Sequence, residues 1–302
     1  MRRKLVEQGG TTLMVSLPSK WARQFKLSKG DEVEVLEQGN GLYIGIDKEV
    51  KQENTHLNIS GMKPLIKRAL GAVYKKGYDS VDVEFDSPEE LQIAQEVINQ
   101  EFVGFEIITL GKKNFTAKRI SSIEHSEFDA ALKRVFMFLF SVGDDTIESM
   151  KNKDTQAARS IALRDVSINK LCDFCRRSLN KRGFADPTKT NMVYFIVEQL
   201  EKIGDVYKNM NDYVAENSLK PGKDIIDCLG KLDSYVRMFY DVFYKFNMQA
   251  MLEFHSRNLA VEKELEKAQD KVQKHELKLV FYMELLKNLV FDMNGAVMAM
   301  NL

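Results

Sequence analysis

Two sets of polar side chains in this sequence could do chemistry, and the first is a series of acids on one predicted helix. Glu201 and Asp205 are four residues apart, and Asn209 follows after another four. This spacing places side chains on one face of an α-helix. Asp165, in the preceding predicted helix, is the natural third carboxylate. Carboxylates that are brought together repel one another, so they are either solvated or hold a cation.

The same polar pattern recurs later in the chain with fewer charges. Glu284, Asn288 and Asp292 repeat the spacing, while Asn258 stands where Asp165 stands in the first copy. Oxygen ligands suit Mg, Mn, Ca or iron, and Zn is kept as a further candidate cofactor. The loss of carboxylates predicts weaker metal binding in the second copy. A solvated charged face remains the alternative for both.

The recurrence extends to the residues around these acids, which indicates two tandem repeats of three helices. We expect the repeats to cover residues 123–218 and 219–302. The stretch "LRDVSINK" aligns with "SRNLAVEK", and "LEKIGDVYKNM" aligns with "MELLKNLVFDM". Apolar periodicity predicts helices near 126–151, 154–182, 189–216, 222–250, 251–273 and 274–300.

The second set of polar side chains is a group of cations near the start of the sequence. Residues 1–30 contain seven lysines and arginines and a single glutamate, whereas the 302-residue chain has 44 basic and 44 acidic residues. A cationic segment on an otherwise acidic protein indicates an anionic partner, here double-stranded DNA. The residues expected to contact DNA are Arg2, Arg3, Lys4, Lys20 and Arg23.

These cations lie on short predicted strands and one short helix, within residues 1–50. Alternating apolar segments flank turns at Gly9-Gly10 and Gly39-Asn40-Gly41, which predicts two hairpins. Ser19 is expected to cap the helix between them. A unit of about 50 residues buries too little apolar surface to fold alone, so a partner must complete its core.

Residues 51–122 alternate between strand-like and helix-like segments, which predicts a small α/β module. Ser87 followed by Pro88 marks the start of its second helix. The module contains no Gly-rich phosphate loop and no cluster of histidines and cysteines. We interpret it as a spacer or a dimerisation module.

Composition argues against several other functions. No apolar run is long enough to cross a membrane, and an odd number of cysteines suits a reducing compartment. We therefore expect a cytoplasmic protein without membrane insertion. Cys172 and Cys175 lie inside a predicted helix and are expected to be structural. Without a nucleophile motif or paired histidines, no enzymatic activity is expected.

The acidic helices carry a first family resemblance. "LEKIGDVYKNM" and "RDVSINKL" resemble helices of the PhoU-type phosphate-uptake regulators, which consist of two tandem three-helix repeats. The resemblance implies a metal cluster at Asp165, Glu201 and Asp205. Weaker ligand candidates are Asn209, Glu284 and Asp292.

A second resemblance concerns the N-terminal segment. "TTLMVSLPSKWARQFKLSKGDEVEVLEQGNGLYI" is similar to the AbrB/MazE/SpoVT-type swapped-hairpin DNA-binding domain, in which two chains exchange hairpins to form one barrel. The expected fold class is thus multi-domain: a dimeric swapped-hairpin β-barrel, a small α/β module and an all-α bundle of two PhoU repeats.

The two resemblances together imply a DNA-binding transcriptional regulator of phosphate uptake whose bundle senses metal, phosphate status or a protein partner. Expected partners are double-stranded DNA, a second copy of the chain, and a phosphate ABC transporter ATPase or signalling protein. The alternative is an adaptor that restrains a phosphate transporter or its signalling partner without binding DNA. In that case the N-terminal unit serves only for dimerisation.

Overall fold

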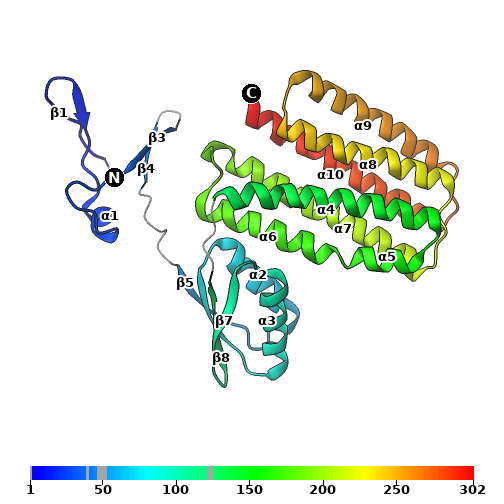
Figure 1. Cartoon of the computed structure of the whole chain (residues 1–302), viewed down its shortest axis with the longest axis horizontal. Helices are drawn as coiled ribbons and strands as arrows, with labels where there is room; N and C mark the ends of the chain where they lie inside the picture. The colour runs from blue at the N-terminus through cyan, green and yellow to red at the C-terminus, as the bar shows by residue number, and fades with distance from the viewer. Residues whose placement is uncertain (1, 39–40, 46–52, 121–124) are drawn as a thin grey trace. The chain divides into compact units, whose positions relative to one another are not determined.

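The computed structural model describes residues 2–38, 41–45, 53–120 and 125–302. The chain divides into two compact units, Met1–Lys51 and Gln52–Leu302. Figure 1 shows short strands and one short helix in the first unit, and an α/β module with a long helical bundle in the second. Within the described residues, no helix is long and apolar enough to span a membrane.

The N-terminal unit consists of two separate hairpins and a helix. Gly9 and Gly10 have left-handed φ values of 70° and 81° in the first turn, a conformation that favours glycine. Ser19 was expected to cap the helix, and this expectation is wrong. Pro18 is the N-cap, no side chain caps the helix, and Ser19 is its first residue. The elements are β1 (Val6–Gln8), β2 (Thr12–Met14), α1 (Ser19–Gln24), β3 (Glu34–Gln38) and β4 (Gly41–Gly45).

The α/β module is a four-stranded sheet with two helices. Its strand order is β5-β6-β8-β7, with β5 parallel to β6 and the other pairs antiparallel. Ser87 caps α3 as predicted, because its hydroxyl accepts from the Glu90 N–H at 3.3 Å and Glu90 bonds back to the Ser87 N–H at 3.1 Å. The elements are β5 (Asn54–Asn58), α2 (Ile66–Lys76), β6 (Ser80–Glu84), α3 (Pro88–Glu101), β7 (Phe105–Leu110) and β8 (Asn114–Arg119).

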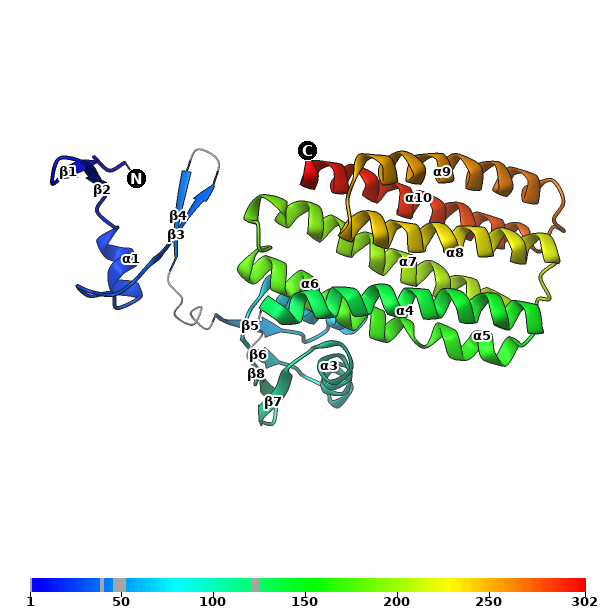
Figure 2. The same cartoon turned by 45° about the horizontal axis from the view of Figure 1, so that its top comes forward.

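The bundle contains two successive three-helix arrays, as the sequence repeat predicts, with one helix broken. The helix expected over 154–182 is divided at Leu163 and Arg164, where the Arg164 N–H bonds to the Ile161 carbonyl at 3.0 Å in a tight turn. Figure 2 shows α5 and α6 as separate segments. The helices are α4 (His125–Asn152), α5 (Thr155–Ala162), α6 (Asp165–Arg182), α7 (Thr190–Glu216), α8 (Lys223–Tyr244), α9 (Met248–Gln269) and α10 (Leu277–Asn301).

A buried ionic cluster joins the α/β module to α6 of the first repeat. The Arg177 side chain is fully buried; it donates to the Tyr74 carbonyl at 2.8 Å and pairs with Asp79 at 3.2 Å. Asp79 also binds Arg119 at 3.1 Å and the ammonium of Lys181. Because both partners are desolvated, breaking such a cluster is strongly unfavourable. The module is therefore held to the bundle by specific contacts.

Candidate functional site

A seam of polar side chains lies between α6 and α7 of the first repeat. Asp165 is buried at the start of α6, where one carboxylate oxygen accepts from the Asn169 amide at 2.8 Å. Its other oxygen, and the amide oxygen of Asn169, are buried without a hydrogen-bond partner among the described residues. Buried oxygens in this state are unfavourable unless a donor or cation reaches them.

The carboxylates predicted as ligands interact electrostatically in this seam. Burial raises the pKa of Asp165 to about 6, and the negative charge of Asp205 adds to the effect. The pKa of Asp205 is also raised, first by burial and then by the charge of Glu201. The structure thus brings Asp165, Glu201 and Asp205 together, as the sequence predicted.

One cation, Arg176 on α6, neutralises part of the seam and was not singled out from the sequence. Its side chain is only 3% exposed and binds Asp173 at 2.6 Å and Glu201 at 2.8 Å. It also binds Glu198. The available sequence signal was the i, i+3 pairing of Asp173 with Arg176 on a helix that faces another acidic helix.

The donor chemistry of the seam fits a hard cation, although the three predicted ligands are not arranged as a metal site. No group of three His, Cys, Asp or Glu side chains is positioned to hold a metal ion within the described part of the chain. Glu201 is paired with Arg176. The unpartnered oxygens of Asp165 and Asn169, together with Asp205, are the oxygen ligands that Mg, Mn or iron prefer.

Cys172 and Cys175 lie within α6 beside this seam and are fully buried. Burial raises the pKa of Cys175 to about 12, and it raises the pKa of Cys172 as well. Both side chains are therefore neutral thiols, which are poor nucleophiles and poor metal ligands. This environment agrees with a structural role.

The corresponding seam of the second repeat contains a lysine. In the repeat alignment Lys287 takes the place of Gly204. Its side chain is buried and its ammonium lies 3.1 Å from Glu262. The hollow beside it, about 350 Å³, also contains Glu284 and Asn288. The second repeat therefore carries its own cation where the first repeat has no side chain.

The last members of the predicted polar stripes, Asn209 and Asp292, are exposed. Glu201, Asp205 and Glu284 are half-buried, and Asn288 is exposed at the edge of the hollow beside Lys287. Each step of four residues turns about 40° around an α-helix, so the third member of a stripe is rotated away from the first. The spacing rule therefore placed the first two positions of α7 better than the third.

The predicted DNA-contacting cations are all exposed. Arg2, Arg3 and Lys4 precede β1 rather than forming part of it, while Lys20 and Arg23 lie on α1. Arg23 donates to the Ser19 carbonyl at 3.3 Å. Among the described residues, none of the five is ion-paired with a carboxylate. Their charges are thus available to an external anion.

The N-terminal unit also exposes its apolar side chains. None of the residues of this unit whose exposure is described (2–33, 35, 41, 42, 44 and 45) is buried. Each hairpin pairs only with itself, in two separate two-stranded sheets. Seven large apolar residues are 42% to 64% exposed: Leu5, Val6, Leu13, Met14, Val15, Val35 and Leu42.

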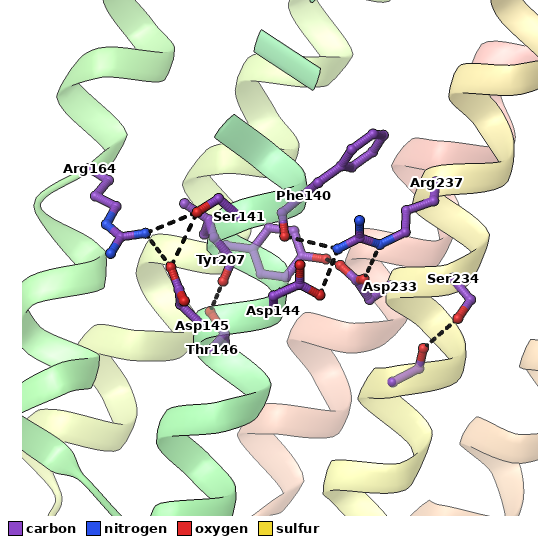
Figure 3. Close-up of polar contacts among 12 residues, drawn as sticks. Phe140, Ser141, Asp144, Asp145, Thr146, Arg164, Tyr207, Asp233, Ser234 and Arg237 are labelled. Carbon is purple, nitrogen blue, oxygen red and sulfur yellow. Dashed lines mark hydrogen bonds and ion pairs between the residues drawn. The ribbon is translucent and has the colours of Figure 1, made fainter. Parts of the chain in front are cut away.

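A second polar network connects the two repeats, between α4 and α8 (Figure 3). Asp233 accepts from the Tyr207 hydroxyl at 3.0 Å and from Arg237 at 2.8 Å. Arg237 also binds Asp144 at 2.7 Å. A Cβ at Gly143 would lie 1.9 Å from an Asp233 oxygen, so this close approach requires glycine. The repeats are thus coupled through a buried polar contact.

Comparison with known proteins confirms both family resemblances. The family model of the MazE antitoxin, described as antidote-toxin recognition MazE, matches residues 6–53. The PhoU domain model matches residues 133–214, which lie within the first repeat. No curated protein matches the chain significantly.

Two solved structures of PhoU-like proteins from Shewanella oneidensis MR-1 are also similar to this chain, one of them described as a PhoU-like phosphate regulatory protein. They are 12% and 13% identical to it and cover 55% of this chain and 95% of their own. Their TM-score is 0.38, which is low.

Proposed function

We propose that this protein is a dimeric, cytoplasmic, DNA-binding transcriptional regulator of phosphate uptake, with the PhoU-type bundle as its sensor. The supporting observation is that the N-terminal unit has exposed apolar side chains on both hairpins and unpaired cations. A second copy of the same unit would cover the apolar faces and double the cationic surface. Its role is binding rather than catalysis.

DNA recognition in this proposal begins with phosphate contacts. Lysine and arginine side chains that neutralise phosphates release counterions, so affinity falls steeply as salt rises. Lys20 and Arg23 lie on a helix, and Arg2, Arg3 and Lys4 lie on the segment before β1. Phosphate contacts set affinity, whereas arginine contacts to base edges set sequence preference.

The bundle would act on DNA binding through the α/β module. The Arg177–Asp79 cluster fixes this module to α6, the helix that also carries Asp165 and Arg176. A ligand that changes the packing of the α6–α7 seam therefore acts on a helix that is ion-paired with the α/β module. Such a ligand alters DNA affinity only if it binds one geometry of the protein better than another.

A metal ion is the first candidate for that ligand. Asp165, Asn169 and Asp205 would hold it, and it would supply positive charge beside Asp165, with which Arg176 forms no ion pair. Elemental analysis of purified protein and of Asp205→Asn tests this assignment. We expect less metal in the variant; equal metal content in both would refute the ligand set.

Fluorescence anisotropy with the full-length chain and labelled genomic DNA fragments tests the regulator. We expect affinity to fall steeply with salt and Arg23→Ala to weaken binding by about threefold to tenfold at low salt, with a smaller salt slope. Lys29→Ala is the matched control, because Lys29 is an exposed cation of the same unit outside the predicted contact set. Binding that is absent, or equal in both variants, would refute DNA recognition by this surface.

The adaptor is the second candidate function, and an apolar stripe on α10 supports it. Leu277, Phe281 and Leu285 follow at intervals of four residues and are 38% to 58% exposed. Such a stripe can pack against a helix of a partner protein. If the chain lacks DNA affinity and co-purifies with transporter ATPase subunits, and Phe281→Ser abolishes the co-purification, the adaptor function replaces the regulator.

A further inference from the structure

A cleft lined by lysines opens where the first repeat meets the second. Its volume is about 480 Å³, and it lies between the end of α4 and the start of α8. Figures 1 and 2 both show the α4–α5 and α7–α8 connections at the same end of the bundle. Lys151 and Lys153 approach from the first connection, and Lys220 and Lys223 from the second. Asp227 is the acid among the lining residues.

The four ammonium groups are not used by ion pairs within the described parts of the chain. All four lysines are exposed, and none forms an ion pair or side-chain hydrogen bond with another described residue. Lys151 and Lys153 are at the C-terminal end of α4, where cations are favourable. Lys220 and Lys223 are at the N-terminal end of α8, where the helix dipole disfavours them. Gly222, the N-cap of α8, supplies no side-chain cap there. The two lysines at this helix start are therefore not explained by a stabilising effect on α8.

The backbone on both sides of the cleft adopts an uncommon conformation. Lys153 has φ = 58° and Ser218 has φ = 49°, although neither is glycine. The ends of α4 and α7 are closed in the same way. The Asp154 N–H donates to the Ser149 carbonyl at 2.9 Å, and the Leu219 N–H donates to the Val214 carbonyl at 3.0 Å. Glycine is the preferred residue at such positions. Lysine at position 153 places its charge at the cleft, and its left-handed backbone conformation is strained.

We propose that this cleft binds an oligophosphate anion. Four ammonium groups against one carboxylate require a ligand with several negative charges, which a chain of phosphates provides. The volume lies in the range of small-molecule sites, about 300–1,000 Å³. Inorganic oligophosphate and nucleoside triphosphate share this chemistry. The idea that this anion is the signal sensed by the bundle rests on the proposed function. The binding site itself does not depend on DNA binding.

Binding here would connect the two repeats directly. The ligand would bridge the end of α4 in the first repeat and the start of α8 in the second. The same two helices share the Asp144–Arg237–Asp233 network in their middle (Figure 3). An anion held by both helices therefore favours one packing of α4 against α8.

Isothermal titration calorimetry of the full-length chain with tripolyphosphate, at constant ionic strength, tests the site. We expect a dissociation constant below about 100 µM and at least tenfold weaker binding in the double variant Lys151→Gln/Lys223→Gln. The control is Lys202→Gln/Lys263→Gln, which removes two exposed, unpaired lysines from α7 and α9. It should bind as the wild type does. Tighter binding of ATP than of tripolyphosphate assigns the site to a nucleotide, and the reverse assigns it to the inorganic anion.

Several results would overturn the proposal. These are the absence of binding, equal weakening in both double variants, and binding of sulfate or orthophosphate as tight as that of tripolyphosphate. Lys153→Gly provides an independent check: we expect an unchanged or higher Tm without anion and weaker binding with it. A lower Tm with unchanged binding would contradict the role of Lys153.

The same variants separate this site from DNA recognition. Lys151→Gln/Lys223→Gln should keep its DNA affinity in phosphate-free buffer and lose tripolyphosphate binding. Arg23→Ala should lose DNA affinity and keep tripolyphosphate binding. A chain that binds tripolyphosphate but no DNA would retain this site and refute the regulator, whereas the opposite result would refute the site alone.

Discussion

The two repeats of the bundle share a polar seam but neutralise it from opposite helices. In the first repeat the buried cation is Arg176 on α6, which reaches Glu201 on α7. In the second it is Lys287 on α10, which reaches Glu262 on α9. The repeat alignment places Gln269 at the position of Arg176. The two seams therefore differ in the position of the cation as well as in the number of acids.

This difference leaves Asp165 in the first seam without an ion-paired cation among the described residues, although the charge of Lys208 on α7 offsets part of its own. Gly204 stands where the second repeat has Lys287 and lies beside Asp165, whose oxygen would be 3.6 Å from a Cβ there. Asp165 is charged when deprotonated and buried, whereas its counterpart Asn258 is neutral. The first repeat thus has a buried carboxylate that a cation would stabilise, whereas the second repeat has a neutral amide at the same position. Three substitutions that exchange these features test the comparison.

Arg176→Gln, which copies Gln269 of the second repeat, has the largest expected effect. It leaves Glu201 without its cation and Asp173 with Lys75 alone, 3.5 Å away. Because the seam is largely buried, we expect a loss of about 3 kcal/mol in the free energy of unfolding. Urea denaturation measures it. Arg182→Gln removes an exposed arginine from the same helix and should change stability by less than about 0.5 kcal/mol. Equal stability of the two variants would show that Arg176 is not needed in the seam.

Asp165→Asn, which copies Asn258, should stabilise the protein above neutral pH. The pKa of Asp165 is about 6 in the folded chain and near 4 when unfolded. The folded state therefore binds the extra proton, and stability falls as pH rises from about 4 to about 6. At pH 7.5 we expect the variant to gain about 1–2 kcal/mol, with little difference at pH 4.

Urea denaturation at both pH values measures this effect, with Asp241→Asn, an exposed acid on α8, as the control. The prediction fails if the difference between Asp165→Asn and the wild type is the same at the two pH values. The result would then mean that Asp165 is solvated rather than held in a low-dielectric seam.

Lys287→Gln should have the smallest effect of the three. Its partner Glu262 is 47% exposed, so water can solvate that carboxylate once the lysine is gone. We expect a loss of about 0.5–1 kcal/mol. Thermal and urea unfolding next to Lys263→Gln, an exposed lysine of α9, provide the measurement. A loss of unfolding free energy as large as that of Arg176→Gln would mean that both seams exclude water to the same degree.

Much of the fold follows from local sequence signals. Ser87 and Pro88 predicted the start of α3, and the paired glycines predicted the first hairpin. The recurrence of acids predicted two helical repeats. Helical spacing predicted that Asp165, Glu201 and Asp205 lie close together, as they do in the first seam. These features depend on neighbours in the chain or on helical spacing, which a single sequence displays.

The missed features depend on contacts between distant residues. The break between α5 and α6 contains neither glycine nor proline; it occurs where Arg164 reaches across to Asp145 on α4. The pairing of Arg176 with Glu201 and the meeting of Arg177 with Asp79 are set by tertiary packing. Sequence spacing identified the acids, but it did not show which cation each one faces.

The exposed hairpins of the N-terminal unit make its assembly a second-order process in the proposed dimer. In that dimer each half of the core comes from a different molecule, so the concentration of dimers able to occupy an operator rises with the square of the chain concentration when monomers predominate. A cell could then adjust the response by changing expression alone. Dilution would then lower operator occupancy by the proposed regulator before any ligand bound to its helices.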